Sequence, residues 1–347
     1  MNFNGKKVSR RDFLRLISAA GAGAVLTACG VNNAAAPSPQ ATETRQSPQP
    51  QVQQGQGENL PPTATAEFTP IPTSAPQGGD AYLAVARGED IAAMTAAAVA
   101  AVGGMERFVK SGNEVIIKPN ICTDYYSYEY GATTNPEVVA SLVRLALGAG
   151  AKRVRVMDQP FGGSPNSAYE RSGIAAAVSA AGGEMEVMNR NKFVRIPIPN
   201  HLDIAEWDFY KEVLDADVVI NVPIAKHHGT TGLSLGCKNM MGVITNPGRI
   251  HSSIHKRIAD LTSLVRPDLT VVDAVRTLMA NGPTGGNLND VKMTNSILAS
   301  HDIVAADTYA ASFFNQTPDT IQYIRYAESL GLGTTDLGSI KIEEIAI

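Results

Sequence analysis

The chain has 347 residues, and its 29 lysines and arginines against 33 aspartates and glutamates give a formal net charge of −4. This slightly acidic balance, with no dense Lys/Arg run in residues 81–347, argues against a nucleic-acid partner. Three cysteines without a C-x-x-C spacing cannot build a zinc ribbon or a ferredoxin-type cluster, so we expect no iron–sulfur cluster from this chain alone.

An export signal is predicted over residues 1–28. Arg10 and Arg11 precede an apolar stretch, residues 16–27, in the arrangement of a twin-arginine signal. This stretch of roughly a dozen residues is too short to span a bilayer, which takes about 20. It ends in Leu26-Thr27-Ala28-Cys29, which resembles a bacterial lipobox. We therefore expect the twin-arginine translocase as a partner during export, cleavage before Cys29, a lipid on that cysteine, and anchoring of the lipoprotein to the outer face of the cell membrane.

Residues 29–80 are predicted to be a disordered spacer. They begin with alanine- and proline-rich sequence, followed by a glutamine-rich run from Gln49 to Gln56 and a proline/threonine stretch from Pro61 to Pro76. Such polar, aromatic-poor sequence buries too little apolar surface to offset the entropy that is lost on ordering. We expect a partly extended tether that holds the rest of the chain away from the membrane.

Residues 81–347 are predicted to form one α/β domain or two fused α/β lobes. Short apolar runs alternate with helical patterns, which is typical of a mostly parallel sheet with helices on both faces. The predicted strands are Glu114–Lys118, Arg153–Met157, Met185–Met188, Asp217–Ile224, Leu269–Asp273 and Ser296–Ser300. The predicted helices are Pro136–Leu147, with Asn135 as its N-cap, and Gly173–Ala181. The stretch Ile196–Pro199 interrupts the pattern and indicates an insertion or an edge element.

Polar side chains follow two of these strands. Lys118 and Asn120 come after the first strand, and Lys226, His227 and His228 come after the strand that includes residues 217–224. Because ligands bind beyond the carboxyl ends of strands in open α/β sheets, these residues are candidates for one site. Lysines at such a site can hold a carboxylate or a phosphate, and a partly buried lysine can also act as a base or a Schiff-base amine.

Three aspartates, Asp158, Asp273 and Asp302, also follow predicted strands. A lone carboxylate after a strand is most often a turn or cap residue. Asp273 could instead neutralise one of the lysines.

Residues 229–255 hold a second group of candidates. The stretch Gly229–Gly242 is rich in glycine, threonine and serine and contains Lys238 and Asn239, so it either wraps an anion with its backbone N–H groups or forms a plain flexible loop. His251 and His255 are four residues apart, which on a helix places them on one face at the spacing of two metal ligands. The alternative is a solvated helix face. The cofactor therefore stays unknown, with a divalent metal and an organic cofactor both open.

In their order along the chain, these motifs resemble the domain of unknown function 362 family. The matching pieces are Val115–Asn120, Thr133–Glu137, Gly148–Ala151, Asp217–His227, Cys237–Gly242, His251, Val272–Asp273, Asn281–Pro283 and Ala299–Asp307. The resemblance implies an α/β fold, and some members of the family carry a fused ferredoxin module whose cysteines this chain lacks. A looser similarity to the nickel-pincer lactate racemase family suggests that an anion is held and a proton moved by Lys226, His228, Lys238 and His251.

Three functions stay open at this point. The first is an enzyme that acts on a small anionic substrate or cofactor, with Lys226, His228 and His251 as the catalytic residues. Its ligand would be bound by Lys118, Asn120, His227, Lys238 and Asn239. The second is a surface-tethered protein that binds a small anion or a metal without turnover, with His251 and His255 as the metal ligands. The third is an accessory protein of a membrane redox or cofactor-assembly complex. Export of an already folded protein favours the first and the third.

Overall fold

The computed structural model describes residues 2–3, 6–7 and 80–347. The twin-arginine pair Arg10 and Arg11, the lipid attachment site Cys29 and the spacer up to residue 79 therefore lie outside the described residues. Two short strands, β1 (Asn2–Phe3) and β2 (Lys6–Lys7), pair with each other antiparallel near the N-terminus. None of the helices that the structure describes is long and apolar enough to cross a membrane.

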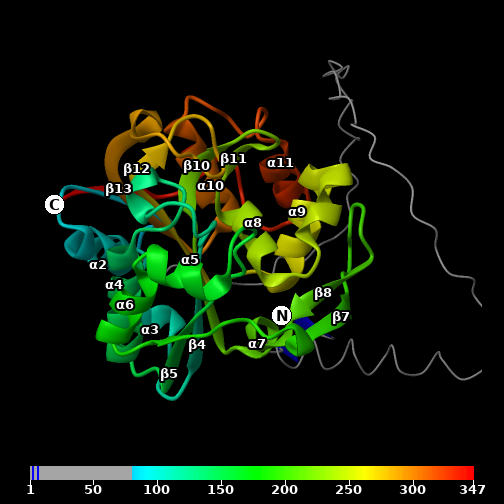
Figure 1. Ribbon diagram of the computed structural model, residues 1–347, viewed down its shortest axis with the longest axis horizontal. Coiled ribbons are helices and arrows are strands. Elements are labelled where there is room, and N and C mark those ends of the chain that lie inside the picture. Colours follow the sequence, from blue (N-terminus) through cyan, green and yellow to red (C-terminus); the bar gives the residue numbers. More distant parts are fainter. Residues whose placement is uncertain (1, 4–5, 8–79) are drawn as a thin grey trace, which may run out of the picture.

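One large, mostly parallel sheet organises residues 80–347, as the sequence predicts (Figure 1). Its main path runs in the order β14-β3-β13-β12-β9-β4-β5-β6, with β10 and β11 added beside β12. Strand β13 is antiparallel to both of its neighbours, and β11 is antiparallel to β10. The strands are β3 (Leu83–Arg87), β4 (Glu114–Pro119), β5 (Arg153–Val156), β6 (Glu184–Met185), β9 (Val218–Val222), β10 (Ile224–His228), β11 (Gly232–Ser234), β12 (Leu269–Leu278), β13 (Val291–Ser300) and β14 (Ile342–Ala346).

Helices cover both faces of this sheet, and each face has its own hydrophobic core. Adjacent residues of β4 show the division, because Ile116 packs in one core while Val115 and Ile117 pack in the other. The Val115 side carries α2 (Ile91–Ala101), α3 (Met105–Phe108), α4 (Pro136–Gly148), α5 (Pro165–Arg171) and α6 (Ile174–Ala180). The Ile116 side carries α7 (Lys211–Asp215), α8 (Gly236–Asn239), α9 (Ile254–Val265), α10 (Ile303–Ser312) and α11 (Gln322–Ser329).

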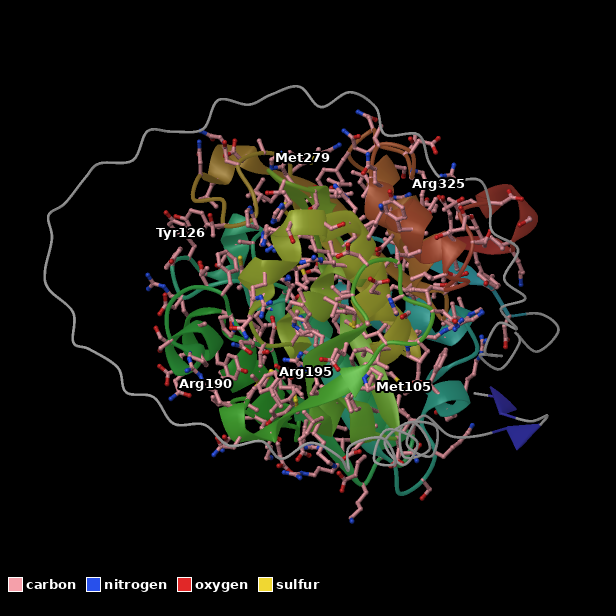
Figure 2. All side chains as sticks on the ribbon, turned by 90° about the vertical axis from the view of Figure 1, so that its right-hand side faces the viewer. Met105, Tyr126, Arg190, Arg195, Met279 and Arg325 are labelled. Atoms are coloured by element: carbon pink, nitrogen blue, oxygen red, sulfur yellow. The ribbon has the colours of Figure 1, made fainter. Side chains whose placement is uncertain are left out.

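Short 3-10 helices and a separate hairpin complete the fold. The 3-10 helices are η1 (Tyr128–Tyr130), η2 (Arg190–Lys192), η3 (Met240–Val243), η4 (Pro247–Ser253), η5 (Leu288–Asp290) and η6 (Leu337–Ser339). Strands β7 (Phe193–Pro197) and β8 (Glu206–Tyr210) form their own two-stranded sheet, so the Ile196–Pro199 stretch belongs to an insertion. Arg195 lies on the outside of this hairpin (Figure 2) and pairs across it with Glu206 and Asp208.

Most predicted elements are present with shifted ends. Helix α4 begins at Pro136, and the Asn135 side chain accepts from the Glu137 N–H, as predicted. Asp273 accepts the N–H of Asn135 at 2.7 Å, and Asp302 caps α10. Both carboxylates therefore accept hydrogen bonds from backbone N–H groups, and neither neutralises a lysine. The predicted strand Met185–Met188 is wrong in extent, because β6 ends at Met185.

The predicted strand Asp217–Ile224 is two strands. Pro223 has no N–H to donate to the sheet, and the run divides there into β9 and β10. Strand β10 continues along β12, with Ile224 beside Asp273, beyond the point where β4 ends. Lys226, His227 and His228 therefore lie within a strand and not in the loop that we expected after it. This extension projects their side chains past the carboxyl end of β4.

Candidate functional site

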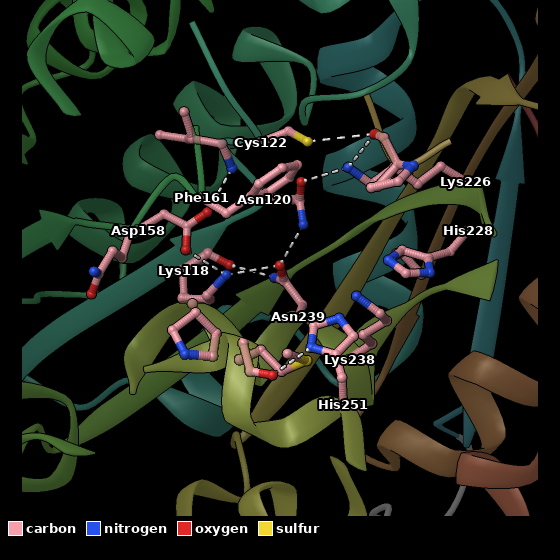
Figure 3. Close-up of a pocket in the computed structure, with 18 residues that line it drawn as sticks. Lys118, Asn120, Cys122, Asp158, Phe161, Lys226, His228, Lys238, Asn239 and His251 are labelled. Atoms are coloured by element: carbon pink, nitrogen blue, oxygen red, sulfur yellow. Dashed lines mark hydrogen bonds and ion pairs between the residues drawn. The ribbon is translucent and has the colours of Figure 1, made fainter. Parts of the chain in front are cut away.

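A cavity of about 410 Å³ opens at the edge of the sheet where β4 and β5 end (Figure 3). Its walls come from segments far apart in the sequence, namely the ends of β4 and β5, strands β10 and β11, helix α8 and the 3-10 helices η3 and η4. The predicted site residues that line it are Lys118, Asn120, Lys226, His228, Lys238, Asn239 and His251. Two predicted residues, His227 and His255, lie outside this lining.

Lys118 and Asp158 form a buried ion pair in the cavity wall. The Lys118 Nζ atom lies 2.7 Å from Oδ1 of Asp158, and the two side chains are 1% and 4% exposed. Nζ also donates to Oδ1 of Asn239 at 2.8 Å and to the carbonyl of Pro119 at 2.9 Å. Burial lowers the pKa of Lys118 and raises the pKa of Asp158, and their mutual attraction opposes both shifts. We expected Lys118 to hold the ligand, but its three donors are already occupied.

The backbone of Gly242 packs directly on this ion pair. A Cβ atom at Gly242 would lie 2.0 Å from Oδ1 of Asp158 and 2.6 Å from Nζ of Lys118. Only glycine lets the chain approach so closely. Most of the Gly229–Gly242 stretch is not the plain flexible loop that was one of its two interpretations, because residues 232–242 form β11, α8 and part of η3.

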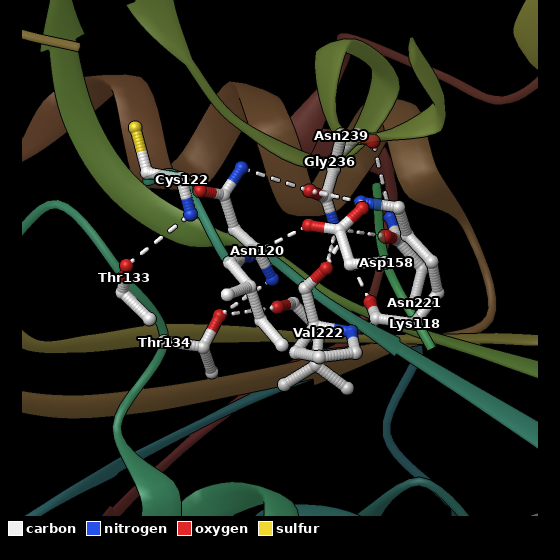
Figure 4. Close-up of polar contacts among 12 residues, drawn as sticks. Lys118, Asn120, Cys122, Thr133, Thr134, Asp158, Asn221, Val222, Gly236 and Asn239 are labelled. Carbon is white, nitrogen blue, oxygen red and sulfur yellow. Dashed lines mark hydrogen bonds and ion pairs between the residues drawn. The ribbon is translucent and has the colours of Figure 1, made fainter. Parts of the chain in front are cut away.

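Two asparagines connect the ion pair to Lys226. The Asn120 side chain donates from Nδ2 to Oδ1 of Asn239 at 3.0 Å (Figure 4) and accepts at Oδ1 from Nζ of Lys226 at 3.0 Å (Figure 3). Asn239 donates in turn to Oδ1 of Asn221 at 2.8 Å. Because each amide has a partner at both of its ends, the network fixes the position of the Lys226 ammonium group.

Lys226 is a buried cation with neutral partners. It is 2% exposed, and Nζ donates to Asn120, to the carbonyl of Ala132 at 2.6 Å and to the carbonyl of Pro283 at 3.1 Å. None of the ion pairs found among residues 80–347 includes Lys226. Its charge is therefore left without a local counter-charge, although its three donors are satisfied.

Lys238 presents an open ammonium group to the cavity. It is half-buried at the end of α8, and its Nζ atom makes no hydrogen bond or ion pair within the described part of the chain. Burial, together with the nearby charges of Lys226 and Lys118, lowers the pKa of Lys238 to about 8. Figure 3 shows Lys238 beside His228 and His251. An anion bound here could accept a hydrogen bond from Nζ of Lys238. It would also be attracted by the nearby charge of Lys226, which has no counter-charge.

His228 is held as a neutral hydrogen-bond donor. Its Nδ1 atom accepts from the backbone N–H groups of Thr230 at 3.1 Å and Thr231 at 3.3 Å, which leaves the proton on Nε2. Burial, followed by the positive charges of Lys238 and Lys226, lowers the pKa of His228 to about 3. The ring therefore stays uncharged at neutral pH and offers an Nε2–H to the cavity.

His251 has the opposite tautomer. Its Nδ1 atom lies 3.0 Å from the carbonyl oxygen of Gly248, which can only accept, so Nδ1 carries the proton. The lone pair of Nε2 is then free to take up a proton. The cavity thus combines one imidazole that donates and one that accepts.

The expected pairing of His251 and His255 on one helix face is not formed. His251 belongs to η4, whereas His255 belongs to α9, and Ser253 between them departs from helical geometry with a φ of −149° and a ψ of 53°. The His255 ring stacks instead on Tyr323, with 6.3 Å between the ring centroids. Residues 80–347 contain no group of three or more His, Cys, Asp or Glu side chains that could hold a metal ion.

The side-chain alternation of β10 separates the neighbouring histidines. Lys226 and His228 face the cavity, while His227 points to the opposite side and accepts from the Gly282 N–H at 3.1 Å. Gly282 approaches so closely that a Cβ atom there would lie 1.9 Å from the His227 carbonyl oxygen. The expectation that His227 binds the ligand directly therefore disagrees with its position in the strand.

Several lining residues were missed by the sequence analysis. They include Cys122, Phe161, Met241, Pro247 and Pro283. Cys122 and Cys237 are both buried and free, so no disulfide joins them. The one sequence signal that could have revealed Phe161 is its place in Phe-Gly-Gly, shortly after the end of β5.

Comparison with known proteins shows what this chain is similar to. Residues 115–312 match the family described as "Domain of unknown function (DUF362)". A thylakoid-associated protein from Synechocystis sp. is 30% identical over 246 residues, which cover 67% of this chain and 73% of that protein. The lactate racemase apoprotein from Thermoanaerobacterium thermosaccharolyticum is 10% identical with a TM-score of 0.42, and the match covers 66% of this chain but only 56% of the racemase chain.

Proposed function

We propose that this chain, which belongs to the DUF362 family, is an enzyme that binds a small anion in the cavity beside Lys238 and transfers a proton to or from it. The observation that carries the proposal is the open ammonium group of Lys238 in a cavity whose second unpaired cation, Lys226, is buried. Two lysines without carboxylate partners repel each other, and a bound anion would relieve that repulsion. A volume of about 410 Å³ suits a small organic carboxylate or phosphate ester.

The two histidines support proton transfer over binding alone. His251 would take up the proton through Nε2, held in position by the carbonyl of Gly248. His228 would donate its Nε2–H to an oxygen on which negative charge develops, and Lys238 would stabilise the same charge. Binding without turnover would need the lysines but no such pair of opposite tautomers.

The binding half of the proposal is tested with Lys238→Met, which keeps the length of the side chain and removes its charge. Inorganic phosphate or succinate at a hundredfold excess over its dissociation constant should stabilise the wild-type protein by about 2.7 kcal/mol, and the melting temperature should rise by several degrees. Lys238→Met should lose this rise, whereas Lys211→Met, at an exposed lysine, should keep it. An equal rise in all three proteins would show that the anions bind elsewhere.

The proton-transfer part of the proposal is tested with the variant His251→Gln, compared with the wild-type protein. Wild-type protein in D2O should exchange a carbon-bound proton of at least one member of a panel of small 2-hydroxy- and 2-oxocarboxylates, followed by NMR. His251→Gln should slow that exchange by about 10²- to 10⁴-fold while the anion-induced rise in melting temperature is kept. If anions bind but no panel member exchanges, the binding protein without turnover becomes the better description.

The location of the protein is also a proposal. The lipobox at Cys29 supports a lipid anchor on the outer face of the membrane after twin-arginine export. Cys29→Ser should move the protein from the membrane fraction to the soluble fraction and remove the lipid mass. A variant that stays in the membrane with its lipid would contradict this assignment.

A further inference from the structure

Phe161 is an exposed aromatic residue in the wall of the cavity. Its side chain is 60% exposed, the largest exposed fraction among the large hydrophobic residues that the structure describes. Tyr125, which is 50% exposed, is on the loop after β4, and its hydroxyl group lies beside the backbone of Gly162. Figure 3 shows Phe161 on the Asn120 side of the cavity, away from His228, Lys238 and His251. Lys238, His228 and His251 therefore form one end of the cavity, and Phe161 lies toward the other, where Lys226 is bonded to Asn120.

Backbone contacts on both sides of Phe161 fix the position of its loop. The N–H of Phe161 donates to the carbonyl of Cys122 at 3.1 Å, and Gly162 forms a β-bridge with Thr123. A Cβ atom at Gly162 would lie 2.6 Å from the Tyr125 hydroxyl oxygen, and one at Gly163 would lie 2.0 Å from the Asp124 carboxyl group. Gly163 also has a φ of +76°, which L-residues rarely adopt. The two glycines let the loop pack tightly while Phe161 stays uncovered.

We propose that Phe161 determines ligand specificity by stacking on a flat ring attached to the anionic group that Lys238 binds. This inference rests on the proposed anion site and adds the class of ligand, an aromatic carboxylate or an aryl phosphate ester. An exposed phenyl ring is costly in water, and a ring laid on it buries apolar surface on both partners. A small anion without a ring would leave Phe161 as exposed as it is without a ligand.

The two ends of the cavity suit the two parts of such a ligand. The anionic group would lie against Lys238 and the Nε2–H of His228, where it meets the charge of Lys226. The ring would lie against Phe161. Ligands that satisfy only one end forgo the contribution of the other.

The test uses anions with the same charged group, with and without a ring. Calorimetry on the full mature protein should give dissociation constants for phosphate and phenyl phosphate, and for acetate and benzoate. The ring should tighten binding to the wild-type protein about tenfold, which corresponds to about 1.4 kcal/mol. In Phe161→Ala the ligands with and without a ring should bind with about equal affinity, and the affinity for phosphate and acetate should not change. Phe161→Tyr should keep the tenfold advantage of the ring.

The outcomes separate this inference from the proposal on which it rests. If phosphate binds and Lys238→Met abolishes that binding, but the ring gives no advantage, then the specificity role is wrong and the anion site stands. An advantage that survives in Phe161→Ala would also overturn the role of Phe161. If none of the four anions binds to the wild-type protein, both proposals fail.

Discussion

Replacing Asp158 with asparagine should destabilise the protein by about 3–5 kcal/mol, because it leaves the Lys118 ammonium group buried without its counter-charge. The environment of Lys118 offers little compensation. Its other partners are the neutral Asn239 and the Pro119 carbonyl, and neither carries a negative charge. Urea unfolding at neutral pH, followed by circular dichroism, would measure the loss in free energy of unfolding.

Two further variants make this measurement specific. The double variant Lys118→Met with Asp158→Asn removes both charges, so it should recover a large part of the stability that Asp158→Asn loses. Asp215→Asn breaks the exposed pair with Lys211 and should cost less than about 1 kcal/mol. If Asp158→Asn costs no more than Asp215→Asn, the buried pair does not hold this wall of the cavity together.

Anion binding should weaken as the pH rises through about 8. Burial, with Lys226 and Lys118 nearby, lowers the pKa of Lys238 to about 8, so the ammonium group is charged below that pH and neutral above it. A carboxylate ligand keeps the same charge over this range, so the change comes from the protein. The dissociation constant of benzoate should be nearly constant between pH 6.5 and 7.5 and should then rise toward about tenfold per pH unit above pH 8.

Lys238→Arg provides the control for this pH dependence. Arginine stays protonated up to a pH above about 12, so the variant should bind benzoate with little change from pH 7 to pH 10. The wild-type protein and Lys238→Arg should therefore diverge only on the alkaline side. A parallel loss of binding in both proteins above pH 8 would assign the titration to another group and would remove Lys238 from the anion contact.

Local sequence was enough to predict much of the fold. The apolar run of β4, the capped start of α4 at Asn135 and Pro136, and the alternation of strands with helices each depend on neighbouring residues alone. The ends of the elements were less well predicted. The apolar pattern predicted one strand that includes Pro223. Because Pro223 has no N–H to donate, that strand is divided into β9 and β10.

The candidate site was predicted in composition and not in detail. The carboxyl ends of parallel strands meet at one edge of a sheet, and this rule predicted that Lys118 and Lys226 lie near each other. Lys238 was a candidate only through its glycine-rich stretch. The role of each lysine depends on atoms that are distant in the sequence. Asp158 occupies Lys118, backbone carbonyls occupy Lys226, and Lys238 is left open.

The sequence by itself determined the class of fold, the order of its motifs and the kinds of side chain available for chemistry, because periodicity and chain order are local properties. The tertiary structure alone decided which residues face the cavity. The register of β10 turns His228 inward and His227 outward, and the junction of η4 with α9 separates His251 from His255. These choices follow from backbone pairing and packing across the sheet, where partners as distant as Lys118 and Asn239 meet.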